Sequence, residues 1–480
     1  MKQLKLYFKG FNRLFGRAPK SSLQKQLEAV EAIRKGQPKR LSAVFGEVID
    51  THLLRKKPGE RNRAFTRVTV FWAALGQVFW GGSCRAALQE IQQARMEEGL
   101  DALSASTSSY CTAKKERMDE ADLKAILVKL GKDLADQDEM LWRGRRIYAV
   151  DGTGVALADT HANQEEYPQP SEQKSGCGFP VMQLVVLQDL ASGAMLDFVD
   201  SPLNVSETSM FCAGALFESL PKDSVMVFDR HYCSYLNIAQ MLTLGIHSVS
   251  RLHQGRKVDL PKGVNDKVVE WTRPVLSRCP DYISREQWQQ MPQKLQVRYI
   301  RISLQQQGFR PENIIIATTL LDEPADQIAA LFLRRWRMEM CFADLKTTLG
   351  MDNLMFQSPE MARKMVILYF IAHNLIRWTL MQAASRFKVD LDRLSFKASL
   401  DVIHHFKDSI YQHKKPADRK RCWIHLLRLI ANDPNPLRPS RSEPRVIKRR
   451  MKGFPLLTKP RSVLKASLQP PPDLSIIPLF

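Results

Sequence analysis

The sequence predicts an α/β protein in which a mixed-sheet core follows an all-α N-terminal region. Two observations support this prediction. Residues 1 to about 135 show helical patterns, and the alternation of apolar and polar residues that is typical of strands begins only at Arg145. From there to residue 251 the order of elements is three strands, a helix, a strand, a helix and a strand, which makes a mixed sheet.

The N-terminal region, residues 1–138, is expected to form a series of short helices. The segment 63–79 carries a wide apolar face, and a glycine pair that begins at Gly81 should end its helix. A Ser/Thr-rich turn at 104–109 then leads into a helix that contains Lys114. Helix, turn and basic helix are compatible with a helix-turn-helix-like DNA reader, although a small helical bundle gives the same pattern.

Two aspartates stand out in the core. The first strand, within 145–157, is expected to end at Asp151 before a Gly-Thr turn, and Asp229 directly follows the buried strand 224–228. The two carboxylates can meet at the open edge that such strand ends form, although Asp is also common there because it suits turns. The other core elements are a hairpin over 182–199, a helix over 206–220, a helix over 235–244 and a strand over 246–250.

The segments that follow the first part of the core differ from it in pattern. Residues 252–325 contain β-rich runs at 295–304 and 313–320, so we expect an inserted, mainly β subdomain. The core resumes at 326–386 with a helix over 329–349, and then an apolar helix that should pack behind the site. The predicted boundaries are 1–138, 139–251, 252–325, 326–386, 387–432 (C-terminal helices) and 433–480 (a basic, Pro-rich tail, expected to be disordered).

The charge of the chain restricts its partners. A formal net charge of +21 and a pI near 9.7 favour a polyanion, either nucleic acid or an anionic membrane surface. The most apolar stretch, 365–384, contains His373, Asn374 and Arg377, which favours a buried core helix over a membrane span. The N-terminus lacks the apolar run of a secretory signal, and the eight scattered cysteines form no CxxC pair, which indicates reduced cytoplasmic thiols and no zinc site.

The helix expected over 329–349 carries four side chains of chemical interest. Phe332, Arg335, Glu339 and Lys346 follow one another at spacings of three, four and seven residues, which places them on one stripe of a helix. Glu339 could hold a divalent metal while Arg335 and Lys346 bind phosphate. A surface helix with ion pairs between neighbouring turns gives the same charges, and Trp336, on the flank of the stripe, is expected in the core.

The exact spacing adds a family resemblance. The pattern F-x2-R-x3-E-x6-K resembles the Y-x2-R-x3-E-x6-K signature of bacterial transposases of the insertion sequence four family, within the DDE transposase group. DGT at 151–153 and FDRHY at 228–232 are similar to the first and second acidic motifs of the family, in the right order. Phe332 stands where the family usually has Tyr, and His231 where Gly is frequent. The resemblance covers residues 140 to about 385.

The resemblance implies a ribonuclease-H-like core in which Asp151, Asp229 and Glu339 are the catalytic acids and the metal ligands. Oxygen-only ligands select a hard cation, so Mg²⁺ is expected, with Mn²⁺ as a substitute. Two such ions would activate a water and stabilise the leaving oxygen of a phosphoryl transfer. The residues implied for DNA binding are Phe332, Arg335, Lys346 and Arg230. The last of these also fits a structural ion pair.

Cut-and-paste transposition is the activity that the resemblance implies. Such a protein binds terminal inverted repeats in double-stranded DNA, hydrolyses a strand at the element end and joins the 3′-hydroxyl to target DNA. A hairpin at the element end, a homodimer in the synaptic complex and a place in the bacterial cytoplasm at the nucleoid are implied as well. Two alternatives stay open, a structure-selective nuclease of the same fold and a decayed DNA-binding protein. Trp271 and Trp288 could stack on a flipped base, but core packing also explains them.

Overall fold

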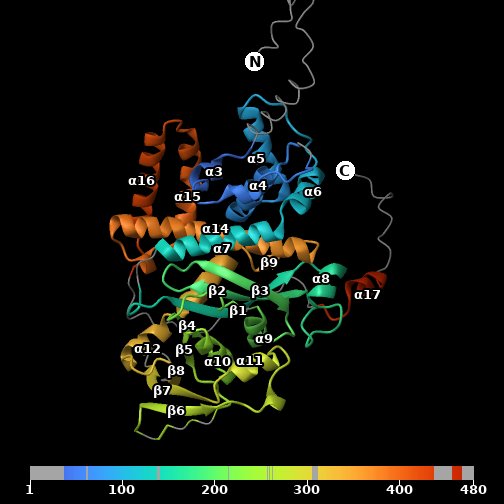
Figure 1. Ribbon diagram of the computed structural model, residues 1–480. Helices are drawn as coiled ribbons and strands as arrows, with labels where there is room; N and C mark the ends of the chain where they lie inside the picture. Colours follow the sequence, from blue (N-terminus) through green and yellow to red (C-terminus); the bar gives the residue numbers. More distant parts are fainter. Residues whose placement is uncertain are drawn as a thin grey trace, which may run out of the picture. The chain divides into compact units, whose positions relative to one another are not determined.

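The computed structural model of the chain describes residues 37–60, 63–137, 141–214, 216–256, 258, 260–261, 263–304, 312–436 and 457–467. The chain forms two compact units, whose helices and strands are labelled in Figure 1. One unit is Met1–Asp119 with Ile410–Gln412, and the other is Glu120–Ser409 with His413–Phe480. The predictions for residues 1–36, and for 437–456 and 468–480 of the tail, lie outside the described residues.

The described part of the first unit is helical, as predicted. The central helix α4 is capped by Thr66, whose side chain accepts from the backbone N–H of Thr69, and ends at Gly81 with a left-handed φ of 63°. A left-handed residue after a helix favours glycine, which is why the glycine pair ends it. Lys114 is only 4% exposed, so it does not lie on a DNA-reading face. The helices are α3 (Arg40–Phe45), η2 (Thr51–Leu54), α4 (Arg67–Trp80), α5 (Cys84–Glu97) and α6 (Ser108–Arg117).

A single mixed sheet forms the centre of the second unit. In the described residues it has nine strands in the order β3-β2-β1-β4-β5-β8-β7-β6, with β9 paired to the end of β1. The hairpin pairs β1–β2 and β2–β3 are antiparallel, whereas β1, β4 and β5 are parallel. This is the predicted ribonuclease-H-like arrangement. The core strands are β1 (Ile147–Leu157), β2 (Val181–Asp189), β3 (Met195–Pro202), β4 (Val225–Phe228), β5 (His247–Arg251) and β9 (Asn353–Leu354).

The inserted segment is mainly β, as predicted, and it extends the core sheet. Strand β8 pairs antiparallel with β5, and β7 and β6 follow outward. Apolar side chains of the insertion, such as Trp271 and Val297, belong to the same buried cluster as Phe228 of β4. The elements of the insertion are β6 (Asp266–Thr272), η4 (Leu276–Arg278), α11 (Arg285–Gln290), β7 (Lys294–Leu304) and β8 (Glu312–Thr318).

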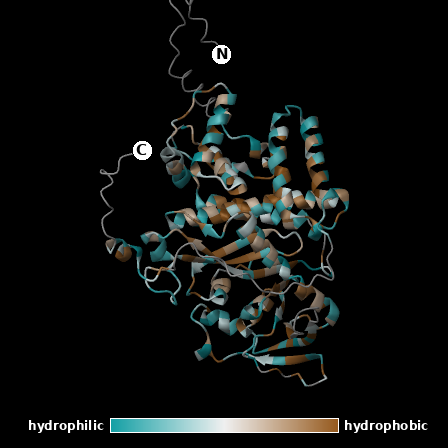
Figure 2. Ribbon diagram, turned by 180° about the vertical axis from the view of Figure 1, so that it is seen from behind, coloured by the Kyte–Doolittle hydropathy of each residue, from teal (hydrophilic) through white to brown (hydrophobic). Residues whose placement is uncertain are grey.

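Helices cover both faces of the sheet, where apolar residues concentrate (Figure 2). On one face α7 and α14 lie side by side against β3, and the buried Asn374 exchanges two hydrogen bonds of 2.8 Å with the backbone of Met195. Helices α9 and α10 pack on the other face around Tyr148 and Val150. No helix in the described residues is long and apolar enough to cross a bilayer. These helices are α7 (Glu120–Gln137), α8 (His161–Glu166), α9 (Glu207–Ala213), η3 (Arg230–Tyr232), α10 (Tyr235–Thr243) and α14 (Pro359–Phe387).

The helix predicted over 329–349 is broken into three pieces, and its prediction as one helix is wrong. At the first break the backbone N–H of Arg335 bonds to the carbonyl of Phe332, three residues back, which tightens the turn. At its end the N–H of Leu349 bonds to the carbonyl of Asp344, five residues back, in a π turn. The pieces are α12 (Ala325–Leu333), α13 (Trp336–Ala343) and the π turn η5 (Asp344–Thr348).

Further helices complete the chain. They are η6 (Leu391–Arg393), α15 (Phe396–Gln412), α16 (Pro416–Asn432) and α17 (Arg461–Ala466). Helix α17 differs from the expectation of disorder for the tail. Nearby, Pro460 contacts the turn at Gly176, where a Cβ would lie 2.9 Å from the proline ring. A contact of this kind can order a segment whose composition alone favours disorder.

Candidate active site

Asp151 lies in the middle of β1, not at its end as the sequence suggested. The strand continues to Leu157 because Asp151 stays paired with Val186 of the antiparallel neighbour β2. On the other side, the parallel neighbour β4 ends at Phe228, which pairs with Val150. Asp151 is therefore the first residue of β1 beyond the end of β4.

Asp229 follows β4 directly, so the ends of two adjacent strands present the two aspartates. It is the residue before the 3₁₀ turn η3, and the N–H of Tyr232 bonds back to its carbonyl oxygen at 3.2 Å. Val150 and Phe228, the residues before the two acids, are paired in adjacent parallel strands, so the acids are neighbours across the sheet. The negative charge of Asp229 raises the pKa of the Asp151 carboxyl. The two acids therefore follow the ends of paired stretches of neighbouring strands, by a strand geometry that differs from the predicted one.

Glu339 joins this pair through Arg335. One guanidinium nitrogen of Arg335 donates to Oδ2 of Asp151 at 3.2 Å, and another donates to Oε1 of Glu339 at 2.8 Å. The side chain of Arg335 is 18% exposed, so these bonds are partly shielded from water. A guanidinium that bridges two carboxylates supplies the positive charge that converging acids require.

The pKa of Asp151 reflects the balance of charges in the site. Burial raises the pKa of Asp151 to about 6, while the Arg335 guanidinium and the backbone N–H of Gly152 act in the opposite direction. The negative charges of Glu207 and Asp229 raise it further. The acids therefore repel one another, and a bound cation would relieve this repulsion.

The donor chemistry fits a hard divalent cation, because Asp151, Asp229 and Glu339 offer only carboxylate oxygens. Within the part of the chain that the structure describes, no three metal-binding side chains are close enough to hold one ion. In this arrangement the guanidinium of Arg335 lies between two of the acids. A divalent ion bound there would take over the charge that the guanidinium supplies.

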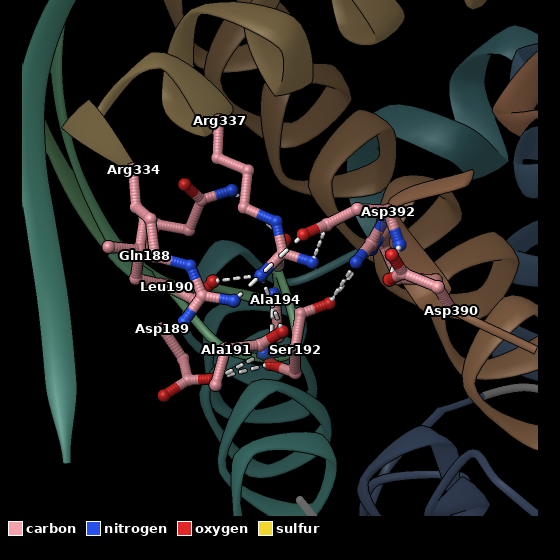
Figure 3. Close-up of polar contacts among 12 residues, drawn as sticks. Gln188, Asp189, Leu190, Ala191, Ser192, Ala194, Arg334, Arg337, Asp390 and Asp392 are labelled. Carbon is pink, nitrogen blue, oxygen red and sulfur yellow. Dashed lines mark hydrogen bonds and ion pairs between the residues drawn. The ribbon is translucent and has the colours of Figure 1, made fainter. Parts of the chain in front are cut away.

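Arg337 fixes the helix that carries Glu339 to the hairpin turn between β2 and β3 (Figure 3). It donates from one nitrogen to the carbonyls of Leu190 (2.6 Å) and Ala191 (2.9 Å), and it forms an ion pair with Asp392. In the same turn, Arg377 of α14 donates to the carbonyl of Ser192. Two arginines, of which Arg377 is buried, therefore satisfy carbonyl oxygens of the turn, and Arg337 ties α13 to it.

Comparison with known proteins connects this geometry to a family. The family described as "Transposase DDE domain" matches residues 142–375, which include all three acids. "Transposase InsG for insertion sequence element IS4" of Escherichia coli (strain K12) is 22% identical over 325 residues, 66% of this chain and 71% of that protein. The chain carries a transposase DDE domain of the IS4 type. It is accordingly an enzyme that acts on DNA.

The chain is also similar to a second curated protein and to a solved structure. "Putative transposase InsZ" of Escherichia coli (strain K12) is 26% identical over 141 residues, 29% of this chain and 46% of that protein. A solved cryo-EM structure of the piggyBac transposase synaptic complex with hairpin DNA aligns with 87% of each chain at 9% identity, with a TM-score of 0.41.

The structure places the residues predicted to bind DNA in three different settings. Phe332 is 8% exposed, so its ring belongs to the core and does not reach DNA in this arrangement. Arg335 pairs with acids, and Arg230 donates to Gln254 at 3.2 Å. Lys346 of the transposase is half-buried and has no hydrogen bond or ion pair among the described residues.

Three tryptophans also have clear settings. Trp271 is 4% exposed and donates to the hydroxyl of Tyr299 at 2.8 Å, and Trp288 donates to the carbonyl of Pro274 at 3.2 Å. Both contacts favour a packing role. The expectation that Trp336 lies in the core is wrong, because its side chain is 55% exposed. The break before α13 turns this residue outward.

Sequence reasoning missed one acid of the site. Glu207, the first residue of α9, lies beside the backbone of Gly152 and acts on the pKa of Asp151. In the sequence it is an ordinary acid in the first turn of a helix, which the helix dipole alone explains. No local signal distinguishes it, because only the tertiary fold brings α9 against β1.

Proposed function

We propose that the transposase binds the terminal inverted repeats of its element, cleaves DNA at the element ends by Mg²⁺-dependent hydrolysis and joins the 3′-hydroxyl ends to target DNA. The observation that carries the proposal is that Asp151 and Glu339 share the guanidinium of Arg335, while Asp229 follows the strand that is paired with the strand of Asp151. Two adjacent strands and one helix deliver these acids, and the matched family spans all of them.

The three acids would hold the metal, with Mn²⁺ able to replace Mg²⁺. Bound in an oxygen-only site, divalent metal ions activate a water and stabilise the leaving oxygen of an in-line phosphoryl transfer. Asp151 and Asp229 are fixed by the sheet, and Glu339 by the anchoring of α13 through Arg337. This anchoring would limit how far each carboxylate has to move when an ion binds.

The cations near the acids would position the DNA backbone. Lys346 carries an ammonium group without a described partner, and Arg335 already binds paired oxygens in a fork that a phosphate can also satisfy. Contacts of this kind set the position of the duplex and carry no sequence information. We assign recognition of the repeats to the helical first unit. By family resemblance, the proposal also includes passage through a hairpin, a dimeric synaptic complex and action at the nucleoid.

The test is cleavage of an end-labelled duplex that carries the terminal repeat of the element, in Mg²⁺ and in Mn²⁺. Wild type should cut and form joined products, whereas Glu339→Gln should bind the duplex and leave it intact, because the amide lacks the metal-binding charge. Cutting without joined products would favour a nuclease. If wild type binds without cutting in either metal, the chain is a DNA-binding protein only. Equal cutting by both proteins would show that the site lies elsewhere.

A further inference from the structure

We propose that Glu207 is a positioning residue of the catalytic site, which fixes the segment that carries Asp151 relative to the turn that follows Asp229. The inference rests on the proposed function, since it concerns the spacing of two proposed metal ligands. Glu207 itself is not assigned as a ligand. It acts through three neighbours: Gln183 and Tyr232, which donate hydrogen bonds to it, and Gly152, on which it packs.

The carboxylate of Glu207 joins two separate elements by hydrogen bonds. Its Oε1 accepts from Nε2 of Gln183 at 3.0 Å, and its Oε2 accepts from the hydroxyl of Tyr232 at 3.0 Å. Gln183 lies on β2 opposite Gly154 of β1. Tyr232 ends the turn η3, and its N–H bonds to the carbonyl of Asp229. One side chain therefore connects the strand pair of the first acid with the turn of the second.

The same carboxylate packs directly on β1. A Cβ added at Gly152 would overlap the carboxylate carbon and Oε1 of Glu207. Side chains alternate along a strand, so Asp151 and Gly152 face opposite sides of the sheet. Asp151 meets Arg335 on one side, and Glu207 supports the strand from the other. Glu207 thus acts on Asp151 through the backbone, as a positioning residue does.

Helix α9 holds the turn η3 at further points. The hydroxyl of Thr208 donates to the carbonyl of His231 at 3.2 Å. The ring of Tyr232, which is fully buried, meets Phe211 of α9 edge to face at a centroid distance of 5.6 Å. The hydroxyl of Tyr232 is therefore presented to Glu207 in one orientation, because the ring has little freedom to move.

The hydrogen bonds of Glu207 do not require its negative charge. Both of its donors are neutral, and within the described residues it forms no ion pair. A glutamine at this position could accept from Gln183 through its carbonyl oxygen and donate to the hydroxyl oxygen of Tyr232 through its amide. Glu207→Gln therefore keeps the connection, whereas Glu207→Ala removes it, and the two variants separate positioning from general disturbance.

The experiment measures Mn²⁺ binding to the full-length transposase by electron paramagnetic resonance of free Mn²⁺, with the Mg²⁺ dependence of cleavage as a second readout. Changes behind metal ligands typically weaken metal affinity about 10- to 100-fold. We expect Glu207→Ala to raise the half-saturating metal concentration by about tenfold, Tyr232→Phe by about threefold, and Glu207→Gln by less than about threefold. Thermal unfolding should show that the variants remain folded.

A matched pair of glycine variants tests the packing contact. Gly152→Ala forces the carboxylate of Glu207 away and should raise the metal requirement as Glu207→Ala does. Gly154→Ala is the control, because a Cβ there meets only Cγ1 of Val181, at 3.4 Å. The double variant Gly152→Ala/Glu207→Ala should be no worse than the single variants, since the overlap disappears with the side chain.

The outcomes separate this inference from the proposed function. If Asp151→Asn leaves both metal readouts unchanged, the proposed metal site is wrong. If Asp151→Asn abolishes binding and cleavage while Tyr232→Phe and Glu207→Ala match wild type in both readouts, the metal site stands and the positioning role is wrong. A positioning role is also excluded if Glu207→Gln is as impaired as Glu207→Ala while both remain folded. When wild type takes up Mn²⁺ only with DNA, the Mg²⁺ dependence of cleavage decides.

Discussion

Replacing Arg335 by alanine should destabilise the metal-free transposase and increase its response to metal. Arg335 makes charge-assisted hydrogen bonds to Asp151 at 3.2 Å and to Glu339 at 2.8 Å. A hydrogen bond to a charged group contributes about 1.5–3 kcal/mol when shielded. The side chain of Glu339 is 36% exposed, so its bond counts as a surface pair of about 0.2–1 kcal/mol.

The sum predicts that Arg335→Ala lowers the free energy of unfolding by about 2–4 kcal/mol and the melting temperature by several degrees. The assay is thermal unfolding followed by circular dichroism, in EDTA and in millimolar Mn²⁺. In wild type, an ion must displace the guanidinium, whereas in Arg335→Ala it meets two uncompensated acids. We therefore expect Mn²⁺ to raise the melting temperature of the variant more than that of wild type.

The control for Arg335→Ala is Arg334→Ala. The neighbouring Arg334 is 47% exposed and lies 4.0 Å from Asp392, so its loss should change stability by less than about 0.5 kcal/mol. The reasoning is refuted if Arg335→Ala unfolds like Arg334→Ala in EDTA. It is also refuted if Mn²⁺ stabilises wild type at least as much as Arg335→Ala.

Three other measurements address the helix behind the sheet, the DNA contact and the response to acid. Asn374→Ala leaves the N–H and carbonyl of Met195 unpaired in the core, so urea unfolding should show a loss of about 2–5 kcal/mol. Lys346→Ala should weaken binding of the repeat duplex about tenfold at low salt and reduce its salt dependence, without a change in melting temperature. The Arg298 guanidinium lowers the pKa of Asp266 in the folded protein. This ion pair therefore stabilises the fold at pH values above the unfolded pKa of Asp, and the stabilisation disappears as the pH falls through the lower folded pKa. On acidification, wild type should lose its stability advantage over Asp266→Asn.

Each of these three predictions could be contradicted by a specific result. Gln382→Ala, on the same helix as Asn374 but at an exposed hydrogen bond, should be nearly neutral, and equal losses would remove the case for the buried amide. A salt dependence of DNA binding that Lys346→Ala leaves unchanged would exclude a phosphate contact. A constant difference between wild type and Asp266→Asn from pH 7 to pH 3 would mean that the ion pair does not govern their relative stability.

The sequence is enough to propose the three candidate acids, but it does not predict the strand and helix geometry around them. Asp151 and Asp229 stand out because each borders a buried apolar strand, and Glu339 because its spacing follows the helical period. The sequence does not show that β1 continues past Asp151, because that depends on pairing with β2, which is remote in the chain. Pairing across a sheet is a tertiary property that local pattern does not contain.

Other differences have the same origin. The break between α12 and α13 occurs among good helix formers, so no Pro or Gly announces it, and its consequence is the exposure of Trp336. Glu207 carries no local signal either, since its role arises only where α9 meets Gly152. In both cases packing decides a feature that propensity leaves open.

The way in which the insertion joins the sheet has a consequence for how such a protein can change in evolution. The insertion leaves from β5 and returns through β8, and these strands pair side by side, with Arg251 opposite Ile316. The entry and the exit of the insertion are thus joined by one ladder, and α12 packs against β5 of this ladder. Segments between these points can be lengthened, shortened or exchanged while the ladder stays closed. The exposed loops of the insertion can therefore diversify most readily, whereas the apolar side chains that it shares with the cluster around Phe228 restrict its strands.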